Sequence, residues 1–463
     1  MPGRHRVLTV VTVIALFAAT LAPAAAQEEP APSEPSTATS SPAATVISAT
    51  RHDTSAPLRD MVRPLTETPE AVEPVEMPLL LPDQVMERAR RRAQPIVEDP
   101  LRQEAPGQVA TPDPIVNFEG QSDDDNDATP GAFRLVPPDT EGDVGPNHYV
   151  QMINIITEIY DKQGNSMLGP FANIDLFSGF GGACETENNG DPIALYDQFA
   201  DRWMLSQFAI EQGIQCVAVS TTGDPTGSYH RYAFKVAPTG NDYPKMGVWP
   251  DGYYLTFNEF NASGDYVQAV ACAFESDEML QGNPAQQVCF GNPASGGDTF
   301  FSLQPAHLEG LTPPPEGTPN PFIMAFDDEV WGASPDPSQD FYKMWHFSVD
   351  WVTPANSTFT GPIDVPTEEF DAEFCNFSRN CIGQPGTATN LDVLGQFTMY
   401  RAVYRSFDDA HPDGAHQELW VNHSVDLDGD SLAGIRWTEI RSPATTPVLH
   451  QTGTWGPADG ENR

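Results

Sequence analysis

Acidic residues recur beside three apolar, aromatic segments of this sequence, and they are its best candidates for chemistry. The first group, in PPDTEGDVGPNHY, contains Asp139, Glu141 and Asp143. Two aspartates precede the second segment and two acids flank the third: Asp191, Asp197, Asp251 and Glu259. Two carboxyl groups that face each other can act on a glycosidic bond, one as general acid and one as nucleophile or base. Asp143, Asp191 and Asp251 are therefore the candidate catalytic residues of a glycoside hydrolase or lyase.

A simpler interpretation explains the same acids without catalysis. Asp, Asn and Gly are the residues that tight turns require, and these acids stand where turns lead into strands. The turn interpretation is the favoured one, and the residues alone leave open whether the protein is an enzyme.

A second acidic pattern suggests a metal site. Asp426, Asp428 and Asp430 alternate with other residues in a loop that contains Gly429, between SVDL and AGIRW. Oxygen ligands with this spacing on a tight turn suit Ca²⁺. The distal Glu of a helix-flanked calcium loop is missing, so a plain solvated turn is an equal alternative.

Other chemistries find little support in the sequence. It has no G-x-S-x-G nucleophile elbow, no Gly-rich phosphate loop and no Cys/His spacing typical of zinc. The formal net charge of −42 disfavours nucleic acid and anionic membranes as partners.

The elements that would position the acids follow an internal repeat. The segment from Val144 to Asn154 returns as the segment from Val248 to Asn258, and DQFADRWMLSQ lies between them. Tyr149, Trp203 and Tyr253 occupy matching places, about 50 residues apart, as expected for blades of a propeller. Later candidates for the same place are Trp331 and Trp420. With 45 prolines and 36 glycines, the pattern predicts an all-β protein, a β-propeller of four-stranded blades with aromatic packing between the blades.

The predicted propeller covers 116–463. The sequence stops in a turn-like stretch, WGPADGENR, that should lead into another strand, so we expect the propeller to be incomplete at its C-terminus. Residues 27–115 are rich in Pro, Ala, Ser and Thr, which predicts a disordered spacer or pro-segment.

Several strings resemble a largely uncharacterised group of secreted bacterial proteins with a sialidase-like β-propeller. They are PPDTEGDVGPNHYVQMIN, GDPIALYDQFADRWMLSQFA, AVSTTGDPTGSYHRYAF, YPKMGVWPDGYYLTFNEF and GIRWTEIR. The resemblance covers about 120–463 and implies the propeller fold. It brings no catalytic residues, because the Asp-box pattern Ser-x-Asp-x-Gly-x-x-Trp is not intact and no trio of arginines can be assigned to a substrate carboxylate.

The N-terminus indicates export. Residues 1–26 have a basic start, a short apolar run and an Ala-rich exit, as in a secretory signal peptide. No later segment is long and apolar enough to span a membrane. An even number of cysteines in an exported chain favours disulfides, and closeness in sequence suggests these pairs: Cys184 with Cys216, Cys272 with Cys289, and Cys375 with Cys381.

Two functions therefore remain open. The first is an extracellular binding or scaffold module for glycans or cell-surface proteins, with Ca²⁺ stiffening the Asp426 to Asp430 loop. The alternative is a glycoside hydrolase or lyase that uses carboxylates in the funnel of the propeller.

Overall fold

The chain divides into two compact units, 1–38 and 39–463, and the structure is a computed structural model. It describes residues 42–62, 74–76, 81–82, 85, 87, 98–103, 111–130, 132–292, 297–333, 338–375, 381–395, 397–429 and 431–457. All of these belong to the second unit. The predicted signal peptide, 1–26, lies outside the described residues.

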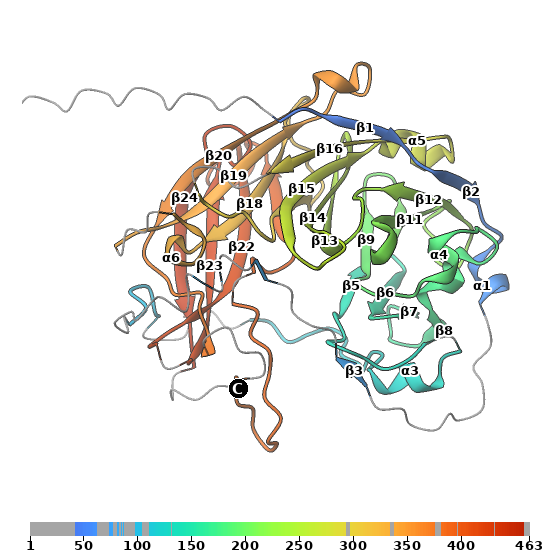
Figure 1. Ribbon diagram of the computed structural model, residues 1–463, viewed down its shortest axis with the longest axis horizontal. Coiled ribbons are helices and arrows are strands. Elements are labelled where there is room, and N and C mark those ends of the chain that lie inside the picture. The colour runs from blue at the N-terminus through green and yellow to red at the C-terminus, as the bar shows by residue number, and fades with distance from the viewer. Residues whose placement is uncertain are drawn as a thin grey trace, which may run out of the picture. The chain divides into compact units, whose positions relative to one another are not determined.

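From residue 141 onward the strands follow one another in sequence as groups of four antiparallel strands, which are the blades of a β-propeller (Figure 1). Blade 1 contains β5 (Glu141–Val144), β6 (His148–Ile153), β7 (Ile156–Asp161) and β8 (Ser166–Ala172). Blade 2 contains β9 (Ile193–Asp197), β10 (Arg202–Ala209), β11 (Ile214–Ser220) and β12 (Tyr229–Lys235). Blade 3 contains β13 (Asn241–Trp249), β14 (Gly252–Phe260), β15 (Tyr266–Phe274) and β16 (Gln286–Asn292). Blade 4 contains β17 (Gln304–Leu308), β18 (Asn320–Phe326), β19 (Asp340–Ser348) and β20 (Thr358–Thr367). Blade 5 contains β21 (Ala402–Phe407), β22 (His416–Asp426), β23 (Ala433–Arg441) and β24 (Val448–Trp455).

The predicted all-β propeller of four-stranded blades is confirmed. The last blade, which the sequence predicted to be incomplete, has four strands in the described part of the chain. Short elements precede the blades or connect them: α1 (Leu58–Met61), β3 (Val75–Glu76), α3 (Asp124–Ala128), β4 (Leu135–Val136), η1 (Asn173–Phe177) and α4 (Ala183–Thr186). Others lie between two strands of one blade: η2 (Ile210–Gln212), α5 (Ser276–Gln281), α6 (Asp328–Trp331) and η3 (Pro354–Asn356).

The aromatic repeat marks the second strand of a blade. Tyr149, Trp203 and Tyr253 are each the second residue of β6, β10 and β14, and Trp420 lies in β22. Trp203 and Tyr253 are fully buried, as packing between blades predicts. The assignment of Trp331 to the repeat was wrong. Trp331 is the last residue of the short helix α6 and not part of a strand. This helix begins after Asp327, whose carboxylate accepts hydrogen bonds from the backbone N–H groups of Glu329 and Val330.

The first strands of the blades contact one another and create a shared centre. β17 and β21 form a parallel ladder, and β5, β9, β13 and β17 pack in succession. The Arg401 guanidinium, just before β21, donates to the Asp143 carboxylate of β5 at 3.0 Å, and this contact links blade 5 to blade 1. Residues at the starts of these strands therefore face a common region.

Part of the predicted spacer, 27–115, is ordered into the blades. β1 (Thr45–Ser48) pairs with β16 and β2 (Arg51–Thr54) pairs with β12, so each adds an outer strand, as Figure 1 shows. The prediction of disorder does not hold for these residues. The β-branched side chains of β1 favour a strand, and the outer edges of β16 and β12 offer unpaired backbone groups to β1 and β2. The composition of the whole segment does not show this.

Three disulfides join the cysteines in the pairs that sequence proximity suggested. Cys184 in α4 is bonded to Cys216 in β11, and Cys272 is bonded to Cys289 across β15 and β16. The third disulfide joins Cys375 and Cys381. Among the described residues, no helix has the length and apolar character needed to cross a membrane.

Candidate active site

A cavity of about 360 Å³ lies where the first strands of blades 1, 2 and 3 begin. The segment that leads into β21 forms another of its walls. The charged and aromatic side chains that line it are Asp139, Glu141, Asp191, Tyr243, Lys245, Asp392, Phe397 and Tyr400. Side chains that are far apart in sequence thus meet in one concave site.

Two aspartates reach the cavity from equivalent turns. Asp139 and Asp191 each stand two residues before the first strand of their blade, and each has a left-handed backbone, with φ of 43° and 44°. Aspartate tolerates this conformation better than most residues. The Asp191 backbone N–H donates to the Asn154 side-chain oxygen at 2.8 Å, which fixes the second turn.

A bulge in β13 places the residues of the third wall. Asp242 pairs with Asn258 and Lys245 with Thr256, so Tyr243 and Pro244 stand opposite the single residue Phe257. Bulges of this kind redirect side chains next to functional sites. Here the bulge presents both Tyr243 and Lys245 to the cavity.

The aspartates form a cluster that retains protons. The Asp139 and Asp191 carboxyl groups are within hydrogen-bonding reach, and Asp242 is a charged neighbour of both. Loss of water raises the pKa of Asp191 well above its ordinary value, and the nearby acids raise it further. The same two causes raise the pKa of Asp242 to about 6. Carboxyl groups this close share protons, because they do not all ionise together at ordinary cost.

Glu141 is an acid of the cavity with a pKa near neutral. Loss of water raises the pKa of its carboxyl group to about 7, although the positive charges of Lys245 and Arg401 partly oppose the rise. At pH 7 the Glu141 carboxyl group is therefore about half protonated.

Lys245 supplies positive charge to the cavity. Its side chain is 8% exposed, and its ammonium lies 4.1 Å from the centre of the Tyr243 ring. Burial alone would lower the pKa of Lys245, but the surrounding Tyr243, Glu141 and Asp191 outweigh burial and raise it. Lys245 therefore stays charged and favours the ionised form of a neighbouring carboxyl group.

The predicted catalytic residues are only partly brought together. Asp191 lines the cavity. Asp143 lies two residues further along β5 than Glu141, where its carboxylate accepts from Arg401 and, at 2.8 Å, from the Tyr196 backbone N–H. It is an ion-paired neighbour of the site and does not line the cavity.

Asp251 lies away from the cavity. It follows the end of β13, six residues beyond Lys245, which corresponds to about 20 Å of extended strand. Its carboxylate accepts from the Tyr254 hydroxyl at 2.9 Å and its backbone oxygen accepts from the Trp351 indole. These contacts fit the turn interpretation of this residue.

Sequence reasoning missed Asp242, Tyr243, Lys245 and Tyr400 at this site. The motif YPKMGVWP contains two of these residues, but a lysine beside a proline carries no chemical signature by itself. Asp139 and Glu141 belonged to the acidic group seen in the sequence, without being chosen as catalytic.

The structure describes part of the predicted calcium loop. Asp426 ends β22, and its carboxylate accepts from the backbone N–H groups of Asp428, Gly429 and Ser431 at 2.9 to 3.2 Å. Asp430 lies outside the described residues. Within the described ranges, no group of three or more His, Cys, Asp or Glu side chains is placed to hold a metal ion. The calcium site remains a prediction.

Comparisons with known proteins give structural likenesses only. No protein-family model matches the chain, and no curated protein matches it. Among solved structures, it is similar to an exo-1,5-alpha-L-arabinanase from a bovine ruminal metagenomic library, with 9% identity, 68% of this chain and 96% of that chain covered, and a TM-score of 0.30. It is also similar to a GH43_1 enzyme from Xanthomonas citri complexed with xylose, with 11% identity, coverage of 69% and 91%, and a TM-score of 0.30.

Proposed function

We propose that this chain is a glycoside hydrolase whose reaction takes place in the cavity at the centre of the propeller. One observation carries the proposal: carboxyl groups that retain protons near neutral pH face other carboxyl groups beside the ammonium of Lys245. Hydrolysis of a glycosidic bond needs one protonated carboxyl group and one ionised group.

The environments suggest a role for each acid. Glu141, with a pKa of about 7, is suited to protonate the leaving-group oxygen as the general acid. Asp139 and Asp191 share protons as a pair, so an oxygen of the pair that is ionised serves as the base or nucleophile. Lys245 stabilises the negative charge that stays on the pair.

Aromatic side chains form the apolar wall that a sugar ring needs. The rings of Tyr243 and Phe397 pack 4.6 Å apart, and the Tyr400 hydroxyl donates to the Met246 backbone oxygen at 2.9 Å. These contacts hold the wall in place, and the cavity volume falls within the range of small-ligand sites.

A binding module is the second candidate, because the same wall and acids could hold a glycan without cleaving it. A binding site needs no carboxyl group with a pKa near neutral, whereas a general acid does, and this favours the hydrolase.

The test is hydrolysis of a panel of 4-nitrophenyl glycosides and of oligosaccharides by the purified chain. Glu141→Gln should lower kcat on oligosaccharides by about 10²- to 10⁴-fold. The loss should be smaller on 4-nitrophenyl glycosides, because their leaving group needs less protonation. Asp191→Asn should impair both classes of substrate, and kcat/KM of the wild type should fall above pH 7 as Glu141 loses its proton.

Asp251→Asn is the matched control, because Asp251 lies outside the cavity and should leave kcat unchanged. If no member of the panel is hydrolysed, and Glu141→Gln and Asp191→Asn instead abolish glycan binding, the cavity is a binding site and the hydrolase proposal fails.

We also propose that the protein is exported. The three disulfides support this, since such bonds persist in oxidising compartments. The mass of the mature protein recovered from an expression host's medium tests cleavage after residue 26. Retention of the intact N-terminus inside the cell would contradict it.

A further inference from the structure

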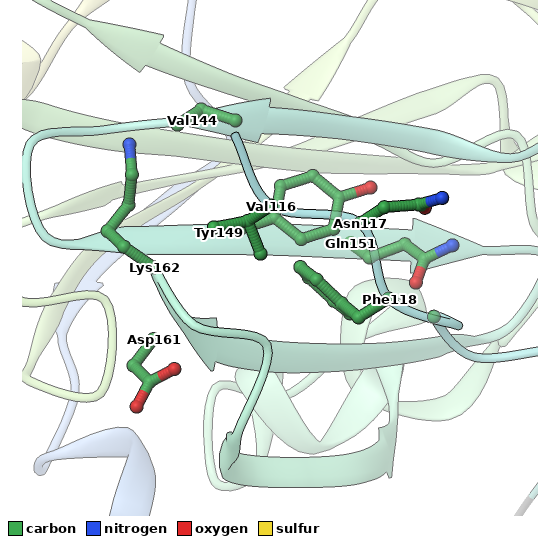
Figure 2. Close-up of a pocket in the computed structure, with 9 residues that line it drawn as sticks. Val116, Asn117, Phe118, Val144, Tyr149, Gln151, Asp161 and Lys162 are labelled. Carbon is green, nitrogen blue, oxygen red and sulfur yellow. The ribbon is translucent and has the colours of Figure 1, made fainter. Parts of the chain in front are cut away.

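A second pocket, of about 470 Å³, lies on blade 1 and shares no lining residue with the cavity (Figure 2). The segment 116–120 forms one wall, and β5, β6 and the turn after β7 form the rest. Successive side chains of a strand point to opposite faces, so Val144 in this pocket faces away from Asp143 and Glu141 in β5. The pocket therefore opens on the face of blade 1 opposite the active-site acids.

Aromatic packing and hydrogen bonds hold the pocket's outer wall in place. The Phe118 ring lies 6.0 Å from the Tyr149 ring and 5.3 Å from the Tyr160 ring. The Gln121 backbone N–H donates to the Gln151 side-chain oxygen at 2.9 Å, and the Gln121 amide donates to the Gln151 backbone oxygen at 3.0 Å. The segment 116–120 is thus anchored at its C-terminal end, and the pocket is formed before any ligand binds.

The polar groups in the pocket are mostly unused hydrogen-bond donors. Within the described part of the chain, the Tyr149 hydroxyl, the Asn117 amide and the Gln151 amide nitrogen make no hydrogen bond. Figure 2 shows the Tyr149 hydroxyl directed toward the side of the pocket where Asn117 and Gln151 are drawn. Among the described residues, Lys162 donates one of its three ammonium hydrogens, to the Gly145 backbone oxygen at 2.9 Å.

Asp161, an acid among the described lining residues, already accepts hydrogen bonds from its own turn. The Asp161 carboxylate accepts from the backbone N–H groups of Gln163 and Asn165 and from the Asn165 amide, at 2.8 to 2.9 Å. Its pKa is lowered by these hydrogen bonds, chiefly those from Asn165. The lining residues that the structure describes include no second carboxyl group, so among them the pocket has binding groups but no acid pair.

We propose that this pocket binds a neutral oligosaccharide and anchors a glycan outside the cavity. The rings of Phe118 and Tyr149, with the exposed Val144, offer apolar surface for the C–H faces of a sugar. The unused amide and hydroxyl groups offer hydrogen bonds to its hydroxyl oxygens. The net charge of −42 disfavours a polyanionic glycan. This site goes beyond the proposed hydrolase activity and does not depend on it.

The experiment is isothermal titration with cellotetraose, xylotetraose and, as the anionic probe, tetragalacturonate. It uses the Glu141→Gln chain, so that hydrolysis does not consume the probes. We expect at least one neutral tetrasaccharide to bind. Asn117→Ala and Tyr149→Phe, added singly, should each weaken that binding by about two- to ten-fold, the usual effect of one lost hydrogen bond.

Gln163→Ala is the matched control, because this exposed residue is on the same turn as Lys162 but does not line the pocket. It should leave the affinity unchanged. The proposal is overturned if neither neutral tetrasaccharide binds, or if tetragalacturonate alone binds. It is also overturned if binding survives Asn117→Ala and Tyr149→Phe and is lost on Asp191→Asn, since the cavity would then be the binding site. Absence of hydrolysis by the wild-type chain, together with the expected binding, would overturn only the proposed enzyme activity.

Discussion

Two regions of this protein bury charged side chains, and they differ in the ratio of acidic to basic groups. Beneath β24, the Arg436 guanidinium donates to the Asp99 carboxylate at 2.8 Å, and both side chains are at most 1% exposed. Arg436 also donates to the Thr454 hydroxyl at 2.6 Å and to the backbone oxygens of Glu368 and Glu369. In the central cavity, by contrast, Lys245 faces several acids.

The difference separates a structural pair from a reactive cluster. At Arg436 one cation pairs with one anion, and nearby oxygens accept three more of the guanidinium hydrogens. Each charge is therefore compensated, and both groups stay ionised. In the cavity the acids outnumber the cations, and some of the carboxyl groups stay protonated, which lowers the negative charge. An excess of one charge is costly to keep, which makes function the better explanation for the cavity than stability.

The largest test of this comparison is Arg436→Met, which leaves Asp99 buried without its partner. We expect the free energy of unfolding to fall by about 3–5 kcal/mol, measured by denaturant titration. Asp99→Leu combined with Arg436→Met should recover much of the loss, because no unpaired charge remains. Arg405→Met, at an exposed position of β21, is the control and should change stability by no more than about 0.5 kcal/mol. A loss below about 1 kcal/mol for Arg436→Met would show that the pair is not structural.

Lys245→Met tests the second region, because the acids of the cavity can compensate for the lost cation by binding protons. At pH 8 the ionised acids lose their counter-charge, and we expect stability to fall by about 2 kcal/mol, less than for Arg436→Met. At pH 5 the acids are largely protonated and the loss should be much smaller. Equal losses at pH 5 and pH 8 would mean that the acids do not respond to Lys245.

Glu141→Gln should raise stability at pH 8. The folded-state pKa of Glu141, about 7, exceeds its ordinary value of 4.5, so the folded state binds more protons between these pH values. Wild-type stability therefore falls as pH rises from 4.5 through 7, by roughly 3 kcal/mol from this group. The Gln variant cannot ionise and should lose less over the same range in denaturant titrations. A wild type whose stability rises from pH 5 to pH 8, with no difference in the variant, would contradict the raised pKa.

The sequence predicted the frame of the site better than the site itself. The repeat of Tyr149, Trp203 and Tyr253 located the second strands of three blades, because a buried aromatic beside a turn leaves a periodic signal. The acids before β5 and β9 could also be found in the sequence, because they occupy the turns that precede the repeated segments. Lys245 was not, because its position depends on a bulge in β13 and on Tyr400, about 150 residues later, and single-sequence patterns do not record such contacts.

Trp331 and β1 are two places where the prediction from sequence was wrong, in opposite directions. At Trp331 an aromatic residue suggested a strand, but the local cap at Asp327 started a helix, so local hydrogen bonding overrode the repeat. At β1 the composition suggested disorder, but pairing with β16, more than 200 residues away in sequence, ordered the strand. Both errors come from contacts that the surrounding composition does not reveal.

The smallest expected effect concerns a third acidic region, the loop of Asp426, Asp428 and Asp430. If it binds Ca²⁺ as the sequence predicts, the ion neutralises the charge of these acids, whereas bound protons neutralise the acids of the cavity. Ca²⁺ at ten times its Kd should then stabilise the fold by about 1.4 kcal/mol and raise the thermal midpoint. Asp428→Asn should reduce that rise without large loss of stability, since the Asp426 carboxylate still accepts the backbone N–H groups of the turn. An equal midpoint with Ca²⁺ and with EDTA would leave Asp426 as a turn residue, and the cavity would remain the only one of these regions with a functional assignment.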